Sequence, residues 1–277
     1  CSIYEEPSLP ELPEVETSRR GIEPYIKGHK ILSIKIYQQA LRWPVSNELY
    51  EMTNQPVSDV LRRGKYIIIC VPDGSILLHL GMSGSLRIVD ERTPRIKHDH
   101  VEFHLSCGKI LRFNDPRRFG SILWSSNWQA HPLIASLGLE PLNEEFDGAY
   151  LHQAAKKRKQ AVKQFLMNSK LVVGVGNIYA NEALFKAGIS PIRSASQISL
   201  KRYNLLADTI KEVLRKSIKQ GGTTLKDFVG SDGKPGYFKQ ELNVYGRGGE
   251  ACVECGQALK EIRQGNRATV YCSQCQK

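Results

Sequence analysis

Residues 66–80, YIIICVPDGSILLHL, decide the fold of the first half of the chain. Two runs of mostly aliphatic residues, 66–71 and 76–80, flank the pair Asp73-Gly74. β-Branched residues favour strands, and an Asp-Gly pair between two such runs is a strong hairpin signal. This stretch therefore predicts an antiparallel hairpin that turns at Asp73-Gly74.

Strand-like patterns continue on both sides of this hairpin, from Lys30 to about Trp128. Residues 100–105 (HVEFHL) and 110–113 (ILRF) flank Cys107-Gly108 and predict a second hairpin. Several short strands separated by turn signals are typical of a sandwich or a barrel. We expect a β domain here.

After about Pro141 the apolar period changes from 2 to 3.6, which indicates helices. One predicted helix runs from Leu200 to Ile218 and stops at Gly221-Gly222. A second begins at Asn177 as N-cap and ends at Gly188. A third, from about Tyr150 to Asn168, carries five basic residues: Lys156, Lys157, Arg158, Lys159 and Lys163.

The amino-acid composition limits the classes of protein to which this chain can belong. The chain has 277 residues, 41% of them hydrophobic, which excludes a mainly disordered chain and is long enough for two domains. Lys and Arg number 39 against 28 for Asp and Glu, a formal net charge of +11. Such an excess of positive charge suggests a polyanionic binding partner, most often nucleic acid, although a solvated basic surface would give the same net charge.

No stretch of the sequence is long enough to cross a membrane. The longest apolar run, residues 66–72, is far short of the ~20 residues that a bilayer requires. Residues 1–6 (CSIYEE) have neither the basic region nor the apolar region of a secretory signal. We expect a cytoplasmic protein that does not associate with a membrane.

Four of the seven cysteines lie close to the end of the chain. Their spacing, C-x2-C-x16-C-x2-C, is typical of a tetrahedral zinc site and is improbable for unconnected thiols. Four cysteine ligands leave no open position, so the single zinc ion should be structural. Arg267 follows the predicted hairpin tip at residues 264–266; an ordinary exposed arginine is equally compatible with this position. The expected ligands are Cys252, Cys255, Cys272 and Cys275.

Residues 10–17, PELPEVET, form a good helix start, with acidic residues at the positive end of the dipole. They also resemble the N-terminus of the bacterial formamidopyrimidine-DNA glycosylases, bifunctional enzymes that remove oxidised purines from DNA. The resemblance extends in the family's order from Pro10 to Lys277. It is carried by LRRGKY (61–66), HLGMSG (79–84), KHDH (97–100), NDPRRFG (114–120), VGVGNIYANE (173–182), GGTT (221–224), SDGKPGYF (231–238) and the cysteine tail.

The resemblance implies an α+β multidomain fold. Residues 10–140 would form a two-sheet β-sandwich with flanking helices, the catalytic domain. Residues 141–240 would form a helix-two-turn-helix DNA-binding domain that includes a lesion-recognition loop at 230–238. Residues 241–277 would form a zinc-finger β-hairpin.

The resemblance also assigns chemistry. A nucleophilic amine attacks the sugar C1′ and forms a Schiff base, and an α-amine, with a pKa near ~8, is far more often neutral than lysine. Pro10 matches the family's nucleophile and Glu11 its proton donor. Lys65 matches the lysine of β-elimination; a solvated lysine that opens a strand is the alternative, which the motif context disfavours. Arg267 matches the finger arginine of δ-elimination.

A base inside a duplex must be everted before such an amine can reach its sugar, and side chains fill the void that it leaves. Met82, Arg117 and Phe119 match the family's intercalating trio, although Met82 and Phe119 alone would suggest core residues. His98 and His100 share a strand face without a third metal ligand, so we set a metal site aside. The family's DNA-holding positions are matched by His98, Arg117 and Arg158, with Arg118, Lys163 and Asn177 as phosphate candidates. Lys234 and Tyr237 lie in the lesion-recognition loop, whose composition also fits a flexible linker.

Nine residues precede Pro10, and an amide bond to Leu9 would leave the proline nitrogen unable to form a Schiff base. We therefore expect residues 1–9 to be absent from the mature enzyme. One hypothesis is initiation at the codon of position 9, with removal of the initiator residue ahead of Pro10.

The sequence thus predicts a monomeric base-excision-repair DNA glycosylase and AP lyase that acts on 8-oxoguanine and formamidopyrimidines in damaged double-stranded DNA. It would act in the bacterial cytoplasm, at the nucleoid. One alternative is the related endonuclease VIII type, which removes oxidised pyrimidines; Leu12 and the Gly-rich loop favour the purine branch. The other is a non-catalytic DNA-binding protein, which a permanently blocked Pro10 would produce.

Overall fold

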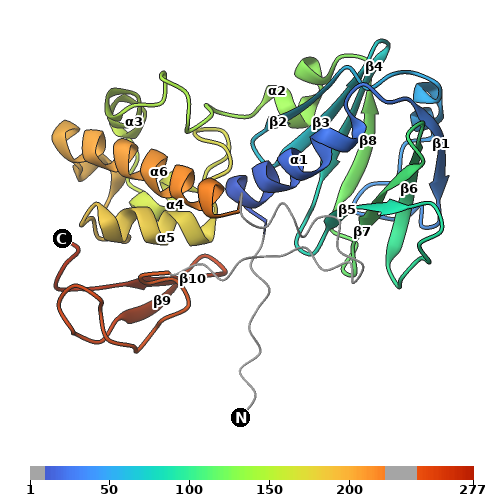
Figure 1. Cartoon of the computed structure of the whole chain (residues 1–277). Coiled ribbons are helices and arrows are strands. Elements are labelled where there is room, and N and C mark those ends of the chain that lie inside the picture. Colours follow the sequence, from blue (N-terminus) through green and yellow to red (C-terminus); the bar gives the residue numbers. More distant parts are fainter. Residues whose placement is uncertain (1–9, 222–241) are drawn as a thin grey trace. The chain divides into compact units, whose positions relative to one another are not determined.

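A computed structural model describes residues 10–221 and 242–277. Its chain contacts divide into two compact units, the first within 10–135 together with 218–221, the second within 136–217 and 242–277 (Figure 1). Lys234 and Tyr237 lie outside the described residues. Within those residues no helix is both long and apolar enough to cross a membrane.

The first unit contains two four-stranded antiparallel sheets, as the family resemblance implied (Figure 1). Apolar side chains from both sheets join one hydrophobic core, to which Val15, Ile22 and Ile26 of helix α1 (Leu12–Ile26) also contribute. One sheet has the order β1 (Ile31–Ile36), β6 (Asp99–Leu105), β7 (Lys109–Asn114), β5 (Ser85–Asp90). The other has the order β2 (Asp59–Arg63), β3 (Tyr66–Val71), β4 (Gly74–His79), β8 (Ser121–Ser125).

The hairpin expected at residues 66–80 is formed by β3 and β4, but its turn lies one residue earlier than predicted. Val71 pairs with Gly74, which leaves Pro72 and Asp73 as the turn. Gly74 is thus the first residue of β4, and a side chain would not fit at this position. A Cβ atom there would lie 2.5 Å from Cζ2 of Trp124 on the neighbouring strand, so the glycine permits close strand approach.

Helices, including all of α6 but its last four residues, and the predicted finger hairpin make up the second unit. The long helix predicted from Leu200 is α6, and the finger hairpin turns at Gly265-Asn266 as expected. The elements are α3 (Gly148–Ala155), α4 (Val162–Leu166), α5 (Asn177–Lys186), α6 (Leu200–Gly221), β9 (Lys260–Gln264) and β10 (Arg267–Tyr271), with the 3-10 helix η3 (Ala195–Gln197). The first unit also has α2 (Pro132–Ala135) and the 3-10 helices η1 (Asn47–Met52) and η2 (Trp128–Ala130).

The prediction of one helix over residues 150–168 is wrong, because α3 and α4 are separated by residues 156–161. Residues 156–160 are all exposed and offer no apolar face for a helix to bury. The backbone instead bonds to a neighbouring loop, with Arg158 accepting from Ser196 and Gln160 accepting from Ala195. Burial of an apolar face supplies most helix stability in proteins, and this stretch has none.

The N-cap of α5 is Gly176, not Asn177 as predicted. The carbonyl of Gly176 accepts the first helical bond, from the N–H of Ala180 at 3.0 Å. Asn177 is therefore the first residue inside the helix.

Glu182 on α5 fixes the chain that enters the finger. Its buried carboxylate accepts from the backbone N–H groups of Asn243, Val244 and Tyr245 and from the side chain of Asn243, each at 2.9 Å. A carboxylate is an acceptor at both oxygens, so it satisfies donors that an amide could not.

We expect Glu182→Gln to lower the free energy of unfolding by about 3 kcal/mol, because an amide NH₂ would face buried N–H donors. Urea denaturation followed by far-UV circular dichroism measures this change. The control is Glu212→Gln, which removes an exposed carboxylate paired with Lys186; it should cost less than about 1 kcal/mol. Equal effects of the two variants would contradict the assignment.

Candidate functional site

Pro10 and Glu11 precede helix α1, and both are buried in the first unit. The side chain of Glu11 is 1% exposed. Its backbone N–H donates to Oε2 of Glu14 at 2.9 Å, which satisfies one of the donors left over at a helix start. The predicted nucleophile and proton donor therefore lie at a well-defined helix N-terminus.

Hydrogen bonds tie α1 to the turn that carries Lys65. Arg62 on β2 donates from Nε to Oε2 of Glu16 at 3.1 Å and from Nη1 to the carbonyl of Gly64 at 3.0 Å. Gly64 has φ +57°, a left-handed conformation that glycine adopts without strain. The half-buried Lys65 follows it directly, so the catalytic lysine candidate is held in relation to the helix that Glu11 starts.

Glu16 remains ionised within this contact. Burial acts to raise its pKa, but hydrogen bonds from Arg19 and Arg20 and the nearby charge of Arg62 together lower the pKa below its ordinary value. The charge that holds Arg62 is therefore present at neutral pH.

His79, at the end of β4, is a functional candidate that the sequence did not single out. Its Nδ1 accepts from the N–H of Gly81 at 2.9 Å, which assigns the proton of the neutral ring to Nε2. Burial, with the charges of Lys65 and Arg42, lowers its pKa to about 4. The result is a neutral donor beside Lys65. The only sequence signal is its place in the stretch HLGMSG.

The structure brings the three predicted void-filling residues onto two touching turns. Phe119 is 44% exposed, and the guanidinium carbon of Arg117 lies 5.2 Å from its ring centroid. Met82 is half-buried on the other turn. A Cβ at Gly81 would lie 2.4 Å from the backbone nitrogen of Gly120, so the two turns meet backbone to backbone.

His98 and Arg118 both have left-handed backbones, with φ of +72° and +58°. Non-glycine residues adopt this region at a cost, and such strain is concentrated at functional sites. The carbonyl of His98 accepts from the N–H of Asp115, and the N–H of Arg118 donates to the carbonyl of Asp115. Both predicted DNA-contact residues are thus anchored to one position.

In the second unit, Arg158 and Arg267 are exposed, as a contact to DNA requires. Asn177 is buried at the start of α5, and its Oδ1 has no hydrogen-bond partner among the described residues. An unpaired buried amide oxygen is suited to an additional hydrogen-bond donor.

Lys163 does not lie where a phosphate contact was predicted. It is 1% exposed, and its ammonium donates to the carbonyl of Ala268 at 2.8 Å and to Oγ1 of Thr269 at 2.5 Å. A buried ammonium that donates to β10 stabilises the finger rather than reaching solvent, because leaving it unpaired there would be costly.

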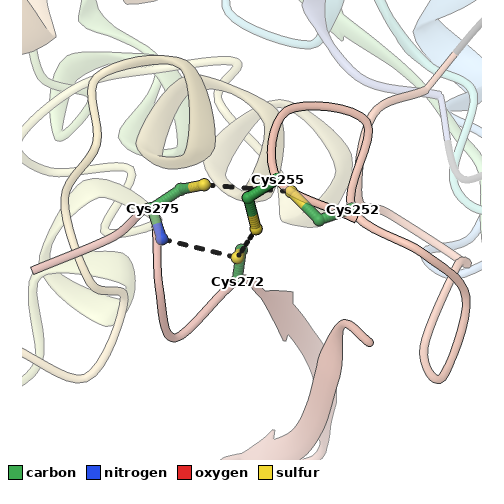
Figure 2. A group of neighbouring side chains, drawn as sticks. All are labelled: Cys252, Cys255, Cys272 and Cys275. Carbon is green, nitrogen blue, oxygen red and sulfur yellow. Dashed lines mark hydrogen bonds between the residues drawn. The ribbon is translucent and has the colours of Figure 1, made fainter. Parts of the chain in front are cut away.

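The four cysteines gather as predicted (Figure 2). All four Sγ atoms lie within 4.8 Å of one another, with Cys252 and Cys275 at 4.0 Å and Cys255 and Cys272 at 3.4 Å. Zinc–thiolate bonds of about 2.3 Å in a tetrahedron separate the sulfurs by about 3.8 Å, so the cluster fits one zinc ion. The N–H of Cys275 also donates to the sulfur of Cys272 at 3.4 Å, an outer hydrogen bond that orients the ligand.

The chain matches three family models. These are the formamidopyrimidine-DNA glycosylase N-terminal domain over residues 9–122, the formamidopyrimidine-DNA glycosylase H2TH domain over 137–229, and the zinc finger found in FPG and IleRS over 249–277. It is 58% identical over 269 residues to the formamidopyrimidine-DNA glycosylase of Escherichia coli O7:K1, covering 97% of this chain and 100% of that protein.

Solved structures of the Lactococcus lactis enzyme are similar to this chain. One, bound to DNA containing N7-benzyl-Fapy-dG, gives a TM-score of 0.85 at 36% identity, covering 97% of this chain and 100% of the other. Another, bound to DNA containing an oxidised pyrimidine, gives 0.85 at 36% identity with the same coverage.

We expect the purified chain to hold one zinc ion, and Cys255→Ser to lose it, because a hydroxyl is a poor substitute for a thiolate ligand. Metal analysis by mass spectrometry measures the stoichiometry. The control is Cys107→Ser, an exposed cysteine outside the cluster, which should retain the metal. Full zinc content in Cys255→Ser would contradict the four-ligand site.

The buried His79 ring should make the stability of the first unit depend on pH. The unfolded chain protonates this ring near pH 6.5 and the folded chain only near 4, so folding stability should fall as the pH is lowered between these values. The expected slope from this ring is about 1.4 kcal/mol per pH unit. Urea denaturation followed by tryptophan fluorescence reports on the first unit, since Trp43, Trp124 and Trp128 all lie there. His79→Asn keeps an acceptor for Gly81 and should flatten the profile; an unchanged profile would refute the assignment.

Proposed function

The chain belongs to the formamidopyrimidine-DNA glycosylase family, and we propose that it removes oxidised purines from duplex DNA and cleaves the abasic site that remains. The observation that carries this proposal is the presence of all three family modules in one chain, at 58% identity over the whole length of a relative. The substrates would be 8-oxoguanine and formamidopyrimidines. The family identity makes the chain a DNA glycosylase of base-excision repair.

Pro10 would supply the nucleophile. Its amine attacks the sugar C1′, the bond from C1′ to the base breaks, and Glu11 delivers a proton as the base leaves or the sugar ring opens. Once the attached nitrogen has lost its proton, its lone pair expels the ring oxygen O4′, which takes up a proton as the sugar opens, and an iminium between Pro10 and C1′ remains. The buried Glu11 next to Pro10 has the adjacency that this proton transfer requires.

This chemistry requires the Pro10 nitrogen to be free of Leu9. We propose that the mature enzyme begins at Pro10. The match to the first family model begins at residue 9, which agrees with initiation at that position followed by removal of the initiator residue.

Lys65 and Arg267 would serve the two eliminations. Loss of a C2′ proton from the iminium expels the 3′-phosphate, and a second elimination expels the 5′-phosphate. Lys65 suits the first step, since its turn is bonded to α1 through Arg62. Arg267 is exposed at the start of β10, where its guanidinium can contact a phosphate.

Residues of both units would hold the DNA. Met82, Arg117 and Phe119 would fill the void of the everted nucleotide, and an exposed aromatic ring is suited to stacking on bases. His98, Arg118, Arg158 and Asn177 would contact the backbone. Lys234 and Tyr237 remain predictions for the lesion-recognition loop.

The partner would be damaged double-stranded DNA, and the enzyme would act as a cytoplasmic monomer at the nucleoid. The net charge of +11 favours a polyanion, and binding should weaken with salt as counterions are released. Residues 10–140, 141–240 and 241–277 remain our domain boundaries.

Oxidised pyrimidines are a second candidate substrate class. A Lactococcus lactis relative of this family was crystallised with DNA that contains an oxidised pyrimidine. Incision assays on matched duplexes with 8-oxoguanine or an oxidised pyrimidine rank the two classes directly.

Borohydride trapping on a duplex with 8-oxoguanine tests the nucleophile. Enzyme that begins at Pro10 should form a covalent adduct that peptide mapping places on Pro10. Enzyme that retains residues 1–9 should form at least about 100-fold less adduct, because an amide nitrogen cannot become an iminium. Pro72→Gly, at an exposed turn, is the matched control and should trap like the wild type.

Intact mass of natively expressed protein accompanies the trapping experiment. An adduct that persists in a chain with both residues 1–9 and Pro10→Gly would refute Pro10 as nucleophile. Tight binding of lesion DNA without any adduct, even from chains that begin at Pro10, would favour the non-catalytic alternative.

A further inference from the structure

We propose that Asp115 is the positioning residue for the void-filling side chains, a buried carboxylate that joins the turn of Met82 to the turn of Arg117 and Phe119. The inference deepens the proposed function and rests on it. Asp115 is 0% exposed, so its carboxylate acts on DNA only through the residues that it holds.

The two carboxylate oxygens of Asp115 bond to different turns. Oδ1 accepts from the hydroxyl of Ser83 at 2.6 Å, and Ser83 directly follows Met82. Oδ2 accepts from the backbone N–H of Gly120 at 2.8 Å, and Gly120 directly follows Phe119. One side chain thus fixes the backbone next to two members of the trio.

Ser83 extends the connection to the third member. Its hydroxyl proton is donated to Asp115, which leaves its oxygen to accept from the backbone N–H of Arg117 at 3.0 Å. Asp115, Ser83 and Arg117 therefore form a short relay of hydrogen bonds between the turns.

The backbone of Asp115 adds the neighbouring DNA-contact residues. Its N–H donates to the carbonyl of His98 at 3.1 Å, and its carbonyl accepts from the N–H of Arg118 at 3.2 Å. Nε2 of His100 contacts the same carbonyl at 2.8 Å. The left-handed backbones of His98 and Arg118 are thus both tied to this residue.

The two turns also pack closely against their surroundings. A Cβ at Gly120 would lie 2.6 Å from Cζ of Phe113 and 2.8 Å from the carbonyl oxygen of His79. Gly81, with φ +65°, meets the opposite turn equally closely. The glycines allow the two backbones to approach, and the bonds from Ser83 and Gly120 to the Asp115 carboxylate hold the turns in one relative position.

The test compares four variants on two DNA probes. Asp115→Ala removes both side-chain bonds, and Ser83→Ala removes the relay to Arg117. Asp115→Asn is the conservative variant: its oxygen can face Gly120 while its NH₂ donates to Ser83, which still accepts from Arg117. Asp90→Asn is the control, since it changes an exposed aspartate paired only with Lys109 among the described residues.

The first probe is a duplex with 8-oxoguanine, where eversion leaves a void. The second is a single-stranded oligonucleotide with an abasic site, where there is no void to fill. On the duplex, Asp115→Ala and Ser83→Ala should incise about 100-fold more slowly, the cost of a misplacement near 1 Å. Their rates on the single strand should stay within about threefold of wild type, since the fold and nucleophile are intact. Asp115→Asn should recover most of the duplex rate, and Asp90→Asn should match the wild type on both probes.

A direct readout is the fluorescence of 2-aminopurine placed opposite a tetrahydrofuran abasic analogue, which changes as the trio enters the duplex. Asp115→Ala should slow this change in parallel with incision. Wild-type duplex rates in both alanine variants would overturn the proposal. So would equal losses on the two probes, which would indicate a merely structural role. Absence of activity in the wild type would instead refute the proposed function.

Discussion

The β-sandwich depends on a single constraint: a buried charged group must be paired with an opposite charge. Arg112 donates to Glu102 at 2.7 Å between adjacent strands, and Arg87 donates to Asp99 one strand away. An unpaired charge at such positions would cost several kcal/mol, so these pairs define which strand registers are tolerated. Asp99 also accepts from the N–H of Ile96, which extends the constraint into the loop before His98.

The same constraint shapes the site. Glu16 holds Arg62 and, through it, the turn of Lys65, while Asp115 holds the turns of the void-filling residues. In both cases a buried carboxylate does not meet the DNA but fixes the backbone beside a residue that is proposed to do so. Chemistry that depends on placement within about 0.5 Å needs such supporting shells.

In the second unit, polar side chains and the cysteine cluster fix the position of the finger. Glu182 accepts from the backbone donors of residues 243–245, and the four cysteines of the finger lie together as a site for one zinc ion (Figure 2). Lys163 bonds the hairpin from α4. A finger of this size has little hydrophobic core of its own, so metal and polar anchors supply its stability.

The sequence by itself determined the features that depend on local pattern. Two apolar runs flanking a turn predicted the β3–β4 hairpin, the 3.6-residue period predicted α6, and the cysteine spacing predicted the zinc cluster. These follow from periods and spacings that neighbouring residues carry. Only the tertiary structure decided what depends on residues distant in the chain. Gly74 lies in β4, where Trp124 of the neighbouring strand leaves no room for a side chain. Residues 156–161 are not helical, because they have no apolar face to bury. Lys163 can be buried because two groups on β10 accept hydrogen bonds from its ammonium. The roles of His79 and Asp115 depend on contacts between separate turns. Burial and pairing are properties of the folded neighbourhood, which a linear pattern does not contain.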